Sequence, residues 1–454
     1  MLSKQSPYAI YMPALSASFA KFGHSSQLKR SFSFTEADLD FLNPASSLFH
    51  YPYALYSAGQ AADTEGAALQ KSTVSERDRN GTTIIGDSGG FQIQEGTIRF
   101  EGDKTTERML RWLEDHADFS MTLDFPTGGI STGKMAPHSK RLIREGYDLT
   151  GPSKRNRLSI DFNACLQQSL TNLNYFKKHR KSGATNLLNV IQGRNEHESK
   201  VWYDAVKGYD LEGWAFAGVH QSSFTMLLNR LIDMKNDGLL ERAKWIHVLG
   251  VSKLANAYLF TVLLHCIRNI NPEIELSFDT AGPFRSAANL QFCTSHRIDK
   301  YGVSIQTQSI SETGSASDHR TLNELCAAIV RPTNVKRDYM SDPVSKDHTV
   351  AQTAVGNHVK VSELCISSNK ASALDSDSYS ILMNHNVQAY LNAFAELNHG
   401  FTENRFQDHV PPRLRIAREV IETVLLGSAN THLMVDPRGL VRENAYILDS
   451  FAQD

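Results

Sequence analysis

The sequence predicts an α/β protein built on a (β/α)8 TIM barrel, with long insertions and a C-terminal, mostly helical extension. Two observations predict this fold. Short apolar segments alternate with amphipathic ones from about residue 9 to residue 305, the pattern of parallel strands that are covered by helices. Polar or glycine-rich residues follow most of the predicted strands, which is where a barrel builds its site. An open, doubly wound sheet is the competing arrangement, and these recurring strand ends favour the barrel.

The predicted strands are short apolar runs, several of them rich in β-branched residues. They are residues 9–12, 82–86, 119–123, 186–191, 214–219, 246–251, 275–278 and 301–305. The amphipathic segments predict helices at 104–117, 156–181, 197–209, 222–240, 253–269, 286–298, 383–398 and 412–427. The first of these begins with Thr105-Thr106-Glu107, residues that cap a helix or favour its positive end. The last opens with two prolines, which suit a first helical turn.

The domain organisation follows from where this alternation stops. Residues 1–305 are predicted to form the barrel domain, with insertions at 16–81 and 127–157. Residues 306–454 are predicted to form an extension packed on the barrel.

The composition indicates which class of protein this is. The chain has 454 residues, 41% of them hydrophobic and 21% charged, as in a soluble globular protein. Its net charge of −2 provides no global basic field, although a local basic face is compatible with it. The N-terminus lacks the apolar core of a signal peptide, and the longest apolar run is too short to span a bilayer. Five scattered cysteines suggest neither disulfides nor a metal knuckle, so we expect a cytoplasmic protein without a membrane partner.

Acidic and amide side chains come at the ends of four predicted strands. They are Asp87, Asp124, Gln192 and Asp279. Several carboxylates without metal-spaced histidines suit substitution at a sugar carbon, in which one carboxylate attacks and another handles the proton. For each acid by itself, a turn or a helix cap is the more common role. Three at one barrel mouth favour a functional site.

The segment Asp87-Ser88-Gly89-Gly90-Phe91-Gln92 suits a flat heterocycle. Its glycines let the backbone approach a ligand closely. The amide of Gln192 and the carboxylate of Asp124 match a purine edge, and Phe91 and Leu249 are placed to sandwich a ring.

This segment closely resembles the signature of the tRNA-guanine transglycosylases, TIM-barrel enzymes that exchange guanine for a 7-deazaguanine base. The resemblance covers roughly residues 80–290. The further matching segments, in order, are Leu123-Asp124, Ile191-Gln192-Gly193, Ala217-Gly218-Val219, Leu249-Gly250-Val251 and Phe278-Asp279-Thr280-Ala281-Gly282-Pro283-Phe284-Arg285.

The resemblance implies a role for each matching residue. Asp279 attacks the sugar C1′ and expels guanine, and Asp87 is the general acid and base. The residues that bind the incoming and leaving bases are Ser88, Gly89, Gly90, Phe91, Asp124, Gln192, Gly193, Gly218, Val219, Leu249 and Gly250. The reaction needs no cofactor.

The chain departs from the family at its zinc site. Members that act on tRNA hold zinc with Cys-x-Cys-x-x-Cys and a later histidine. His385 lies in a segment that resembles the histidine helix, but the triad is absent and Cys365 stands alone nearby. One cysteine and one histidine cannot close a tetrahedral site, so we expect no metal and a packing or capping role for His385.

These features make the chain most similar to the DNA-modifying branch of the superfamily, which inserts preQ0 (7-cyano-7-deazaguanine) into DNA in a restriction-modification system. That likeness implies DNA as the macromolecular partner and an ATPase partner protein that helps to open it. The alternatives are a tRNA enzyme without zinc, a non-catalytic accessory subunit and, last, a glycosidase.

Basic residues near the predicted mouth are candidate phosphate contacts. They are Lys140, Arg141, Arg144, Lys154, Arg155 and Arg157 in the second insertion, and Arg285 after the nucleophile segment. The alternative for the insertion is an ordinary solvated surface. The basic run at 177–181 ends a predicted helix, where cations favour the dipole.

Overall fold

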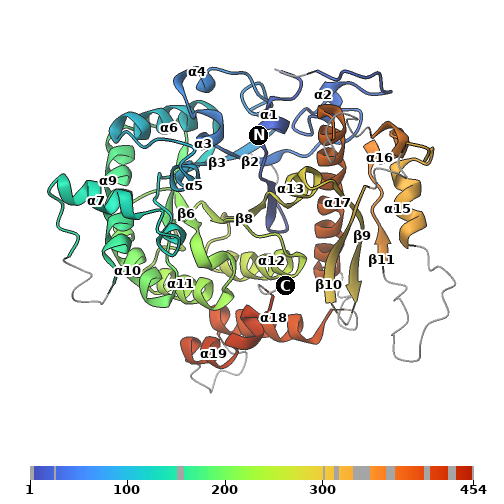
Figure 1. The fold of residues 1–454 in the computed structure, drawn as a ribbon. Helices are drawn as coiled ribbons and strands as arrows, with labels where there is room; N and C mark the ends of the chain where they lie inside the picture. The colour runs from blue at the N-terminus through green and yellow to red at the C-terminus, as the bar shows by residue number, and fades with distance from the viewer. Residues whose placement is uncertain are drawn as a thin grey trace.

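Eight parallel strands form one sheet in the computed structural model (Figure 1), in the order β1-β8-β7-β6-β5-β4-β3-β2. The structure describes residues 5–24, 27–150, 158–299, 302–310, 316–330, 348–364, 374–402, 410–427 and 436–451. The strands are β1 (Ile10–Pro13), β2 (Tyr53–Ser57), β3 (Thr83–Asp87), β4 (Phe119–Met121), β5 (Asn186–Ile191), β6 (Gly213–Phe216), β7 (Trp245–Val248) and β8 (Glu275–Thr280). A parallel bridge between Ala14 and Leu55 joins the two edge strands, so the barrel is nearly closed. The predicted (β/α)8 fold class is confirmed.

Helices lie between the strands and cover the outside of the sheet. The longer ones are α6 (Asp103–His116), α9 (Ile160–His179), α10 (Glu196–Val206), α11 (Phe224–Asn236) and α12 (Leu254–Arg268). Three of them begin at capping side chains: Ser159, Asn195 and Ser223 each accept a hydrogen bond from a backbone N–H of the first turn. These caps fix the residue at which each helix begins.

Three predicted elements are wrong: one barrel strand was missed, one was misassigned, and one helix was misplaced. β2 lies within residues 16–81, which we expected to be an insertion without a barrel strand. Residues 301–305 do not supply the eighth barrel strand: β10 (Gly302–Ser309) pairs with β9 (Gln291–Asp299), which also pairs with β11 (His348–Val350), in a separate antiparallel sheet. The helix expected at 286–298 is α13 (Gly282–Ala288) followed by β9. No residue of β10 is buried: its first four residues are partly exposed and its last four are exposed, as suits an antiparallel strand outside the barrel.

Short helices occupy the connections at the carboxyl ends of the strands. They are α3 (Ala58–Ala61), α4 (Glu65–Ala68), α5 (Gly90–Glu95), η1 (Thr127–Ile130), α7 (Ala136–Arg144) and η2 (Gly218–Gln221). α1 (Ala17–Lys21) and α2 (Glu36–Leu39) precede β2. The second predicted insertion, residues 127–157, therefore contains η1 and α7.

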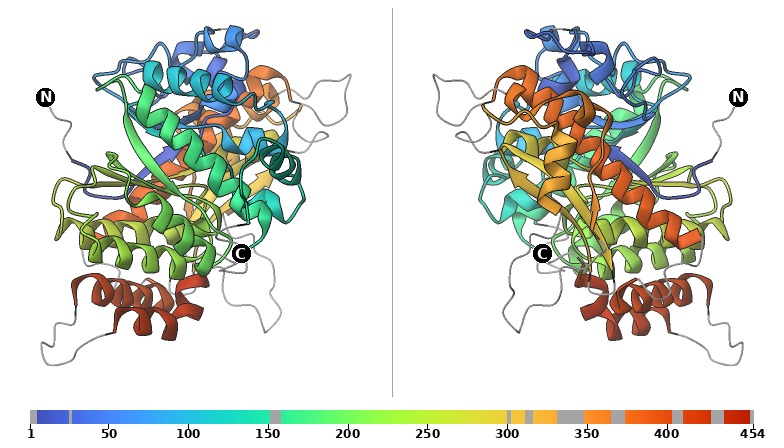
Figure 2. Two further views of the ribbon diagram at one scale, coloured as in Figure 1. Left: turned by 90° about the vertical axis from the view of Figure 1, so that its left-hand side faces the viewer. Right: turned by 90° about the vertical axis from the view of Figure 1, so that its right-hand side faces the viewer.

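The C-terminal region is mostly helical, as expected, and packs on the barrel helices. Its helices are α15 (Leu322–Val330), α16 (Ala354–His358), η3 (Val361–Glu363), α17 (Ser376–Thr402), α18 (Pro412–Leu426), α19 (Pro437–Glu443) and α20 (Ala445–Asp449). α17 and α18 both pack against α12, and Figure 2 shows α18 and α19 along one side of the barrel. The domain boundary predicted at residue 305 falls inside β10.

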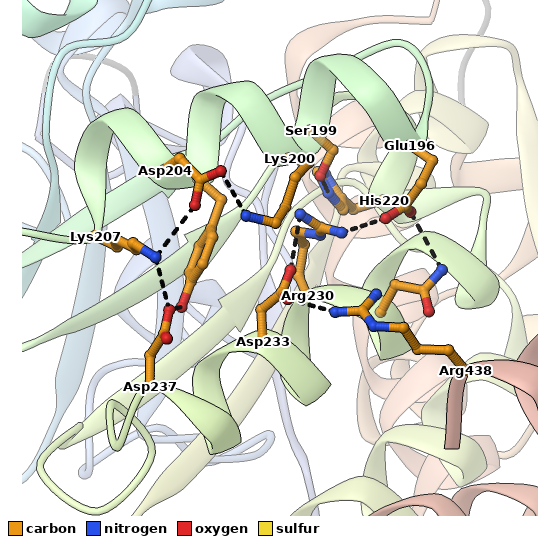
Figure 3. A network of polar contacts seen from close by, with 12 residues as sticks. Glu196, Ser199, Lys200, Asp204, Lys207, His220, Arg230, Asp233, Asp237 and Arg438 are labelled. Atoms are coloured by element: carbon orange, nitrogen blue, oxygen red, sulfur yellow. Dashed lines mark hydrogen bonds and ion pairs between the residues drawn. The ribbon is translucent and has the colours of Figure 1, made fainter. Parts of the chain in front are cut away.

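A polar network anchors this region to the barrel (Figure 3). Arg438 of α19 forms an ion pair with Asp233 of α11, which also lies 2.9 Å from Arg230. Arg230 is buried and pairs with Glu196 at the start of α10. The network thus connects α10, α11 and α19.

Mostly apolar side chains fill the barrel interior. They are Ile10, Met12, Leu55, Ile85, Met121, Leu188, Val190, Ala215, Ala217 and Trp245. The barrel is therefore a packed core rather than a pore. Among the described residues, no helix combines the length and apolar character required to cross a membrane.

Candidate active site

The carboxyl ends of β3, β4, β5 and β8 bring the three acids and the glutamine to one mouth. Asp87 ends β3, Asp124 comes just after β4, Gln192 follows β5, and Asp279 is the next-to-last residue of β8. Asp124, Gln192 and Asp279 are 8%, 2% and 7% exposed. The negative charge of Asp279 acts on Asp87, and that of Asp87 acts on Asp124. The mouth therefore concentrates negative charge in a largely water-excluded place.

Asp124 and Gln192 form a direct pair. Gln192 Nε2 donates to Asp124 Oδ2 at 2.6 Å, and Ser88 Oγ lies 3.5 Å from Asp124 Oδ1. Burial raises the pKa of Asp124 to about 7, against the opposing effect of the Gln192 hydrogen bond. The pair presents an acceptor that is about half ionised near neutral pH.

Asp87 is positioned by the strand that the sequence did not reveal. Ser57 ends β2 and is in register with Asp87. Burial, with the nearby charge of Asp279, raises the pKa of Asp87, although hydrogen bonds from Ser57 and from the backbone of Ser88 and Gly89 favour its ionised form. A carboxyl with a raised pKa suits proton transfer near neutral pH. The available signal for Ser57 was a small polar residue directly after a short apolar run.

Asp279 is held by one of its two oxygens. Its Oδ1 accepts a hydrogen bond from the Gly250 N–H at 2.7 Å and lies 3.2 Å from His247 Nε2. Among the residues that the structure describes, none donates a hydrogen bond to Oδ2. Because Oδ1 is fixed and Oδ2 is not engaged, Oδ2 is the atom suited to attack. His247, inside β7, is a second site residue that the sequence prediction missed.

The glycine pair after Asp87 serves packing within the protein. Gly89 has a φ of 91°, and a Cβ there would lie 2.7 Å from the Cα of Gly59. A Cβ on Gly90 would lie 2.1 Å from the carbonyl oxygen of Asp124. The glycines therefore allow the turn after β3 to close on its neighbours. The close approach of their backbone to a ligand stays a prediction.

The remaining predicted base-binding residues lie around the same mouth. Gly193 and Val219 are joined by a backbone hydrogen bond of 3.3 Å, and Gly218 packs on the Gln192 side chain. Leu249 is half-buried and Gly250 is exposed. The ring of Phe91 on α5 is 58% exposed, so its faces are accessible for stacking.

His220, which follows Val219, has a structural role. Its Nδ1 lies 2.6 Å from the carbonyl oxygen of Ala217 and its Nε2 lies 2.8 Å from Ser199 Oγ (Figure 3). Burial lowers the pKa of His220 to about 4, so the ring is neutral and fixes the turn after β6.

The predicted phosphate contacts differ in their surroundings. Lys140 and Arg144 on α7 and Arg285 on α13 are exposed. Arg141 forms an ion pair of 3.0 Å with Glu145 and lies over the Phe100 ring, 5.3 Å from its centroid, which gives it a role within the protein. Lys154, Arg155 and Arg157 lie outside the described residues.

The residues around His385 do not fit the zinc site of the family it resembles. His385 is fully buried, with Nδ1 2.7 Å from Thr353 Oγ1 and Nε2 2.8 Å from the Cys293 carbonyl oxygen. Both ring nitrogens are thus engaged in hydrogen bonds, which suits the packing role expected for His385. In the described ranges no group of three or more candidate ligands is close enough to hold a metal ion, and Cys365 lies outside them.

No protein-family model matches the chain, and no curated protein matches it either.

Proposed function

We propose that this protein is a guanine transglycosylase that replaces guanine in DNA with a 7-deazaguanine base of the preQ0 type, through a covalent ester between Asp279 and the sugar. The observation that carries the proposal is the pair of unlike carboxyls at one mouth. Asp279 has one oxygen held by two donors and one disengaged, whereas Asp87 has a raised pKa. A nucleophile and a separate proton carrier are what base exchange requires.

The proposed cycle is balanced in bonds and protons. Asp279 Oδ2 attacks C1′ as the bond from C1′ to guanine N9 breaks, and Asp87 in its protonated form gives its proton to the departing base. The incoming 7-deazaguanine then returns a proton to Asp87 as its ring nitrogen attacks C1′ and releases Asp279. Each base arrives and leaves neutral, so no cofactor is consumed.

Asp124 and Gln192 are proposed to read the edge of the base. A carboxylate accepts from the ring N–H and the exocyclic amine of guanine, and the amide of Gln192 adds a donor and an acceptor. Phe91 is proposed to stack on the ring. The target nucleotide has to leave the duplex stack, which costs on the order of a few kcal/mol, and the implied ATPase partner would help to supply this.

One feature supports DNA over tRNA, and a second supports a nucleic-acid partner in general. The tRNA-acting members use a zinc subdomain that the residues around His385 do not fit. Lys140 and Arg144 on α7 follow β4 on the same side of the barrel as Asp124, where a basic surface can hold a nucleic-acid backbone.

Removing these two charges tests the surface. The double variant Lys140→Ala, Arg144→Ala should bind duplex DNA more weakly, and the slope of log affinity against log salt concentration should become shallower by about 1.8, because two phosphate contacts are lost. Fluorescence anisotropy over a salt series measures both effects. Lys177→Ala, Lys178→Ala is the matched control, since it removes two exposed charges at the far end of α9, remote from the mouth. If the slope changed equally in the two double variants, the effect would come from the overall charge of the protein and not from a DNA contact at Lys140 and Arg144.

The raised pKa of Asp124 predicts a pH dependence of base binding. Below pH 7 the carboxyl becomes protonated, so it loses its charge and can no longer accept from both the ring N–H and the exocyclic amine. Affinity for preQ0 should fall about fivefold from pH 7 to pH 6 and about tenfold more by pH 5, following the ionised fraction. Calorimetric titration of the base measures this. Asp124→Asn should bind weakly at every pH, and a wild-type affinity that does not change with pH would contradict the role of Asp124.

Incorporation of labelled preQ0 tests the function itself. The purified protein is offered duplex DNA and total tRNA in parallel, with and without cell extract. Label in DNA is the expected result. Label in tRNA alone would make the protein a zinc-independent tRNA enzyme. Label in neither, even with extract, would favour a non-catalytic accessory subunit.

A further inference from the structure

A chain of three buried polar side chains lies behind Asp279 inside the barrel. Trp245 Nε1 lies 2.6 Å from Ser277 Oγ, which lies 2.8 Å from His247 Nδ1, and His247 Nε2 lies 3.2 Å from Asp279 Oδ1. Trp245 is 5% exposed, and Ser277 and His247 are fully buried. The chain joins β7 to β8 and ends at the proposed nucleophile.

The chemistry of its two ends sets the direction of this chain. The indole N–H of Trp245 can only donate, so Ser277 Oγ accepts from it. The carboxylate of Asp279 can only accept, so His247 Nε2 carries the ring proton and donates to it. Nδ1 is then the acceptor nitrogen of the ring, and it accepts the hydroxyl proton of Ser277. Ser277 thereby selects the tautomer of His247, as a partner on one ring nitrogen does generally.

We propose that His247 is a positioning residue for base exchange, which holds Asp279 Oδ1 so that Oδ2 faces the sugar carbon. This inference rests on the proposed function. Together with the Gly250 N–H, His247 fixes the rotation of the carboxylate about its side chain. In the second half of the cycle Asp279 leaves C1′ as a carboxylate. The same two donors then stabilise the charge that develops on it, as preorganised donors do at an oxyanion.

A merely structural role would not produce this contribution to rate. His247 does not face the base, because its two ring nitrogens are directed to Ser277 and Asp279. Loss of its N–H should therefore lower kcat and leave the KM for the incoming base unchanged. A substitution at His247 can also disturb packing in the barrel. Comparing two variants with side chains of similar size separates that effect from the loss of the N–H.

The test compares His247→Leu with His247→Gln in the intact protein. Glutamine keeps an N–H near the position of Nε2, whereas leucine has none. We expect kcat to fall about 100-fold in His247→Leu, with less than about a tenfold fall in His247→Gln and an unchanged KM for preQ0 in both. Ser277→Ala should give an intermediate loss, because the tautomer is no longer selected. Equal losses in the leucine and glutamine variants, or wild-type kcat in the leucine variant, would overturn the proposal.

An activity-independent measurement separates this proposal from the proposed function. ¹⁵N NMR of the histidine ring, assigned with His247→Gln, should show the His247 ring proton on Nε2. A proton on Nδ1 alone would overturn the role of His247 even in an active enzyme. Wild-type protein that exchanges no base would overturn the proposed function, and with it any catalytic consequence of the chain.

Discussion

Asp279→Asn is expected to abolish base exchange, by about 10⁴-fold or more, while the protein keeps its fold. The geometry explains why the substitution should leave the fold intact and yet remove activity. Gly250 and His247 both donate to Oδ1, so the amide oxygen of the new side chain takes that place. The amide nitrogen then stands where Oδ2 was, and it cannot form the ester with the sugar.

Incorporation of labelled base measures this loss, and the thermal unfolding midpoint reports the fold. Asp210→Asn is the matched control, because Asp210 is exposed in the connection before β6, at the opposite end of the barrel. It should exchange base at the wild-type rate. If Asp279→Asn still exchanged base, Asp279 could not be the nucleophile.

Asp87→Ala is expected to stop turnover, with a loss of at least about 100-fold, and yet to permit the covalent adduct. The variant keeps the nucleophile but lacks the acid that protonates the departing guanine, so water has to supply that proton and the adduct forms more slowly. It also has no group to take the proton of the incoming base, so the adduct is not resolved. The adduct should therefore accumulate, and a denaturing gel with labelled DNA detects it as a slowly migrating protein band. The same gel with Asp279→Asn should show no such band.

Ser57→Ala serves as the control for Asp87. It removes a hydrogen bond to the carboxyl but keeps the carboxyl itself, so turnover should persist. Normal exchange in Asp87→Ala would show that another group carries the proton.

The sequence predicted the parts of the fold that local pattern determines. Buried parallel strands are short apolar runs, which can be recognised in the sequence. The carboxyl ends of such strands all lie at one end of a barrel, so the acids that end or follow them lie at the mouth. This is why the pattern of strand ends was enough to place Asp87, Asp124, Gln192 and Asp279 together. The helix starts at Ser159, Asn195 and Ser223 likewise depend on neighbours in the sequence.

What the sequence could not show depends on long-range pairing. β2 is a five-residue strand within a long, weakly patterned region, and its partner β3 identifies it only in three dimensions. Ser57 was missed with it. His247 looks like one polar residue in an apolar strand, and its role appears only when β8 places Ser277 and Asp279 beside it. Arg141 shows the converse, because its contacts with Glu145 and Phe100 give a basic residue a role within the protein.

The central claim is that Asp279 carries the sugar during exchange, and mass spectrometry of the trapped protein tests it most directly. Wild-type protein is incubated with guanine-containing DNA without incoming base, with cell extract to supply a DNA-opening partner, then denatured and digested with nuclease and protease. The account predicts one free guanine released per adduct and a nucleotide remnant on the peptide that contains Asp279. A remnant on another residue, or guanine release with no adduct on any peptide, would contradict it.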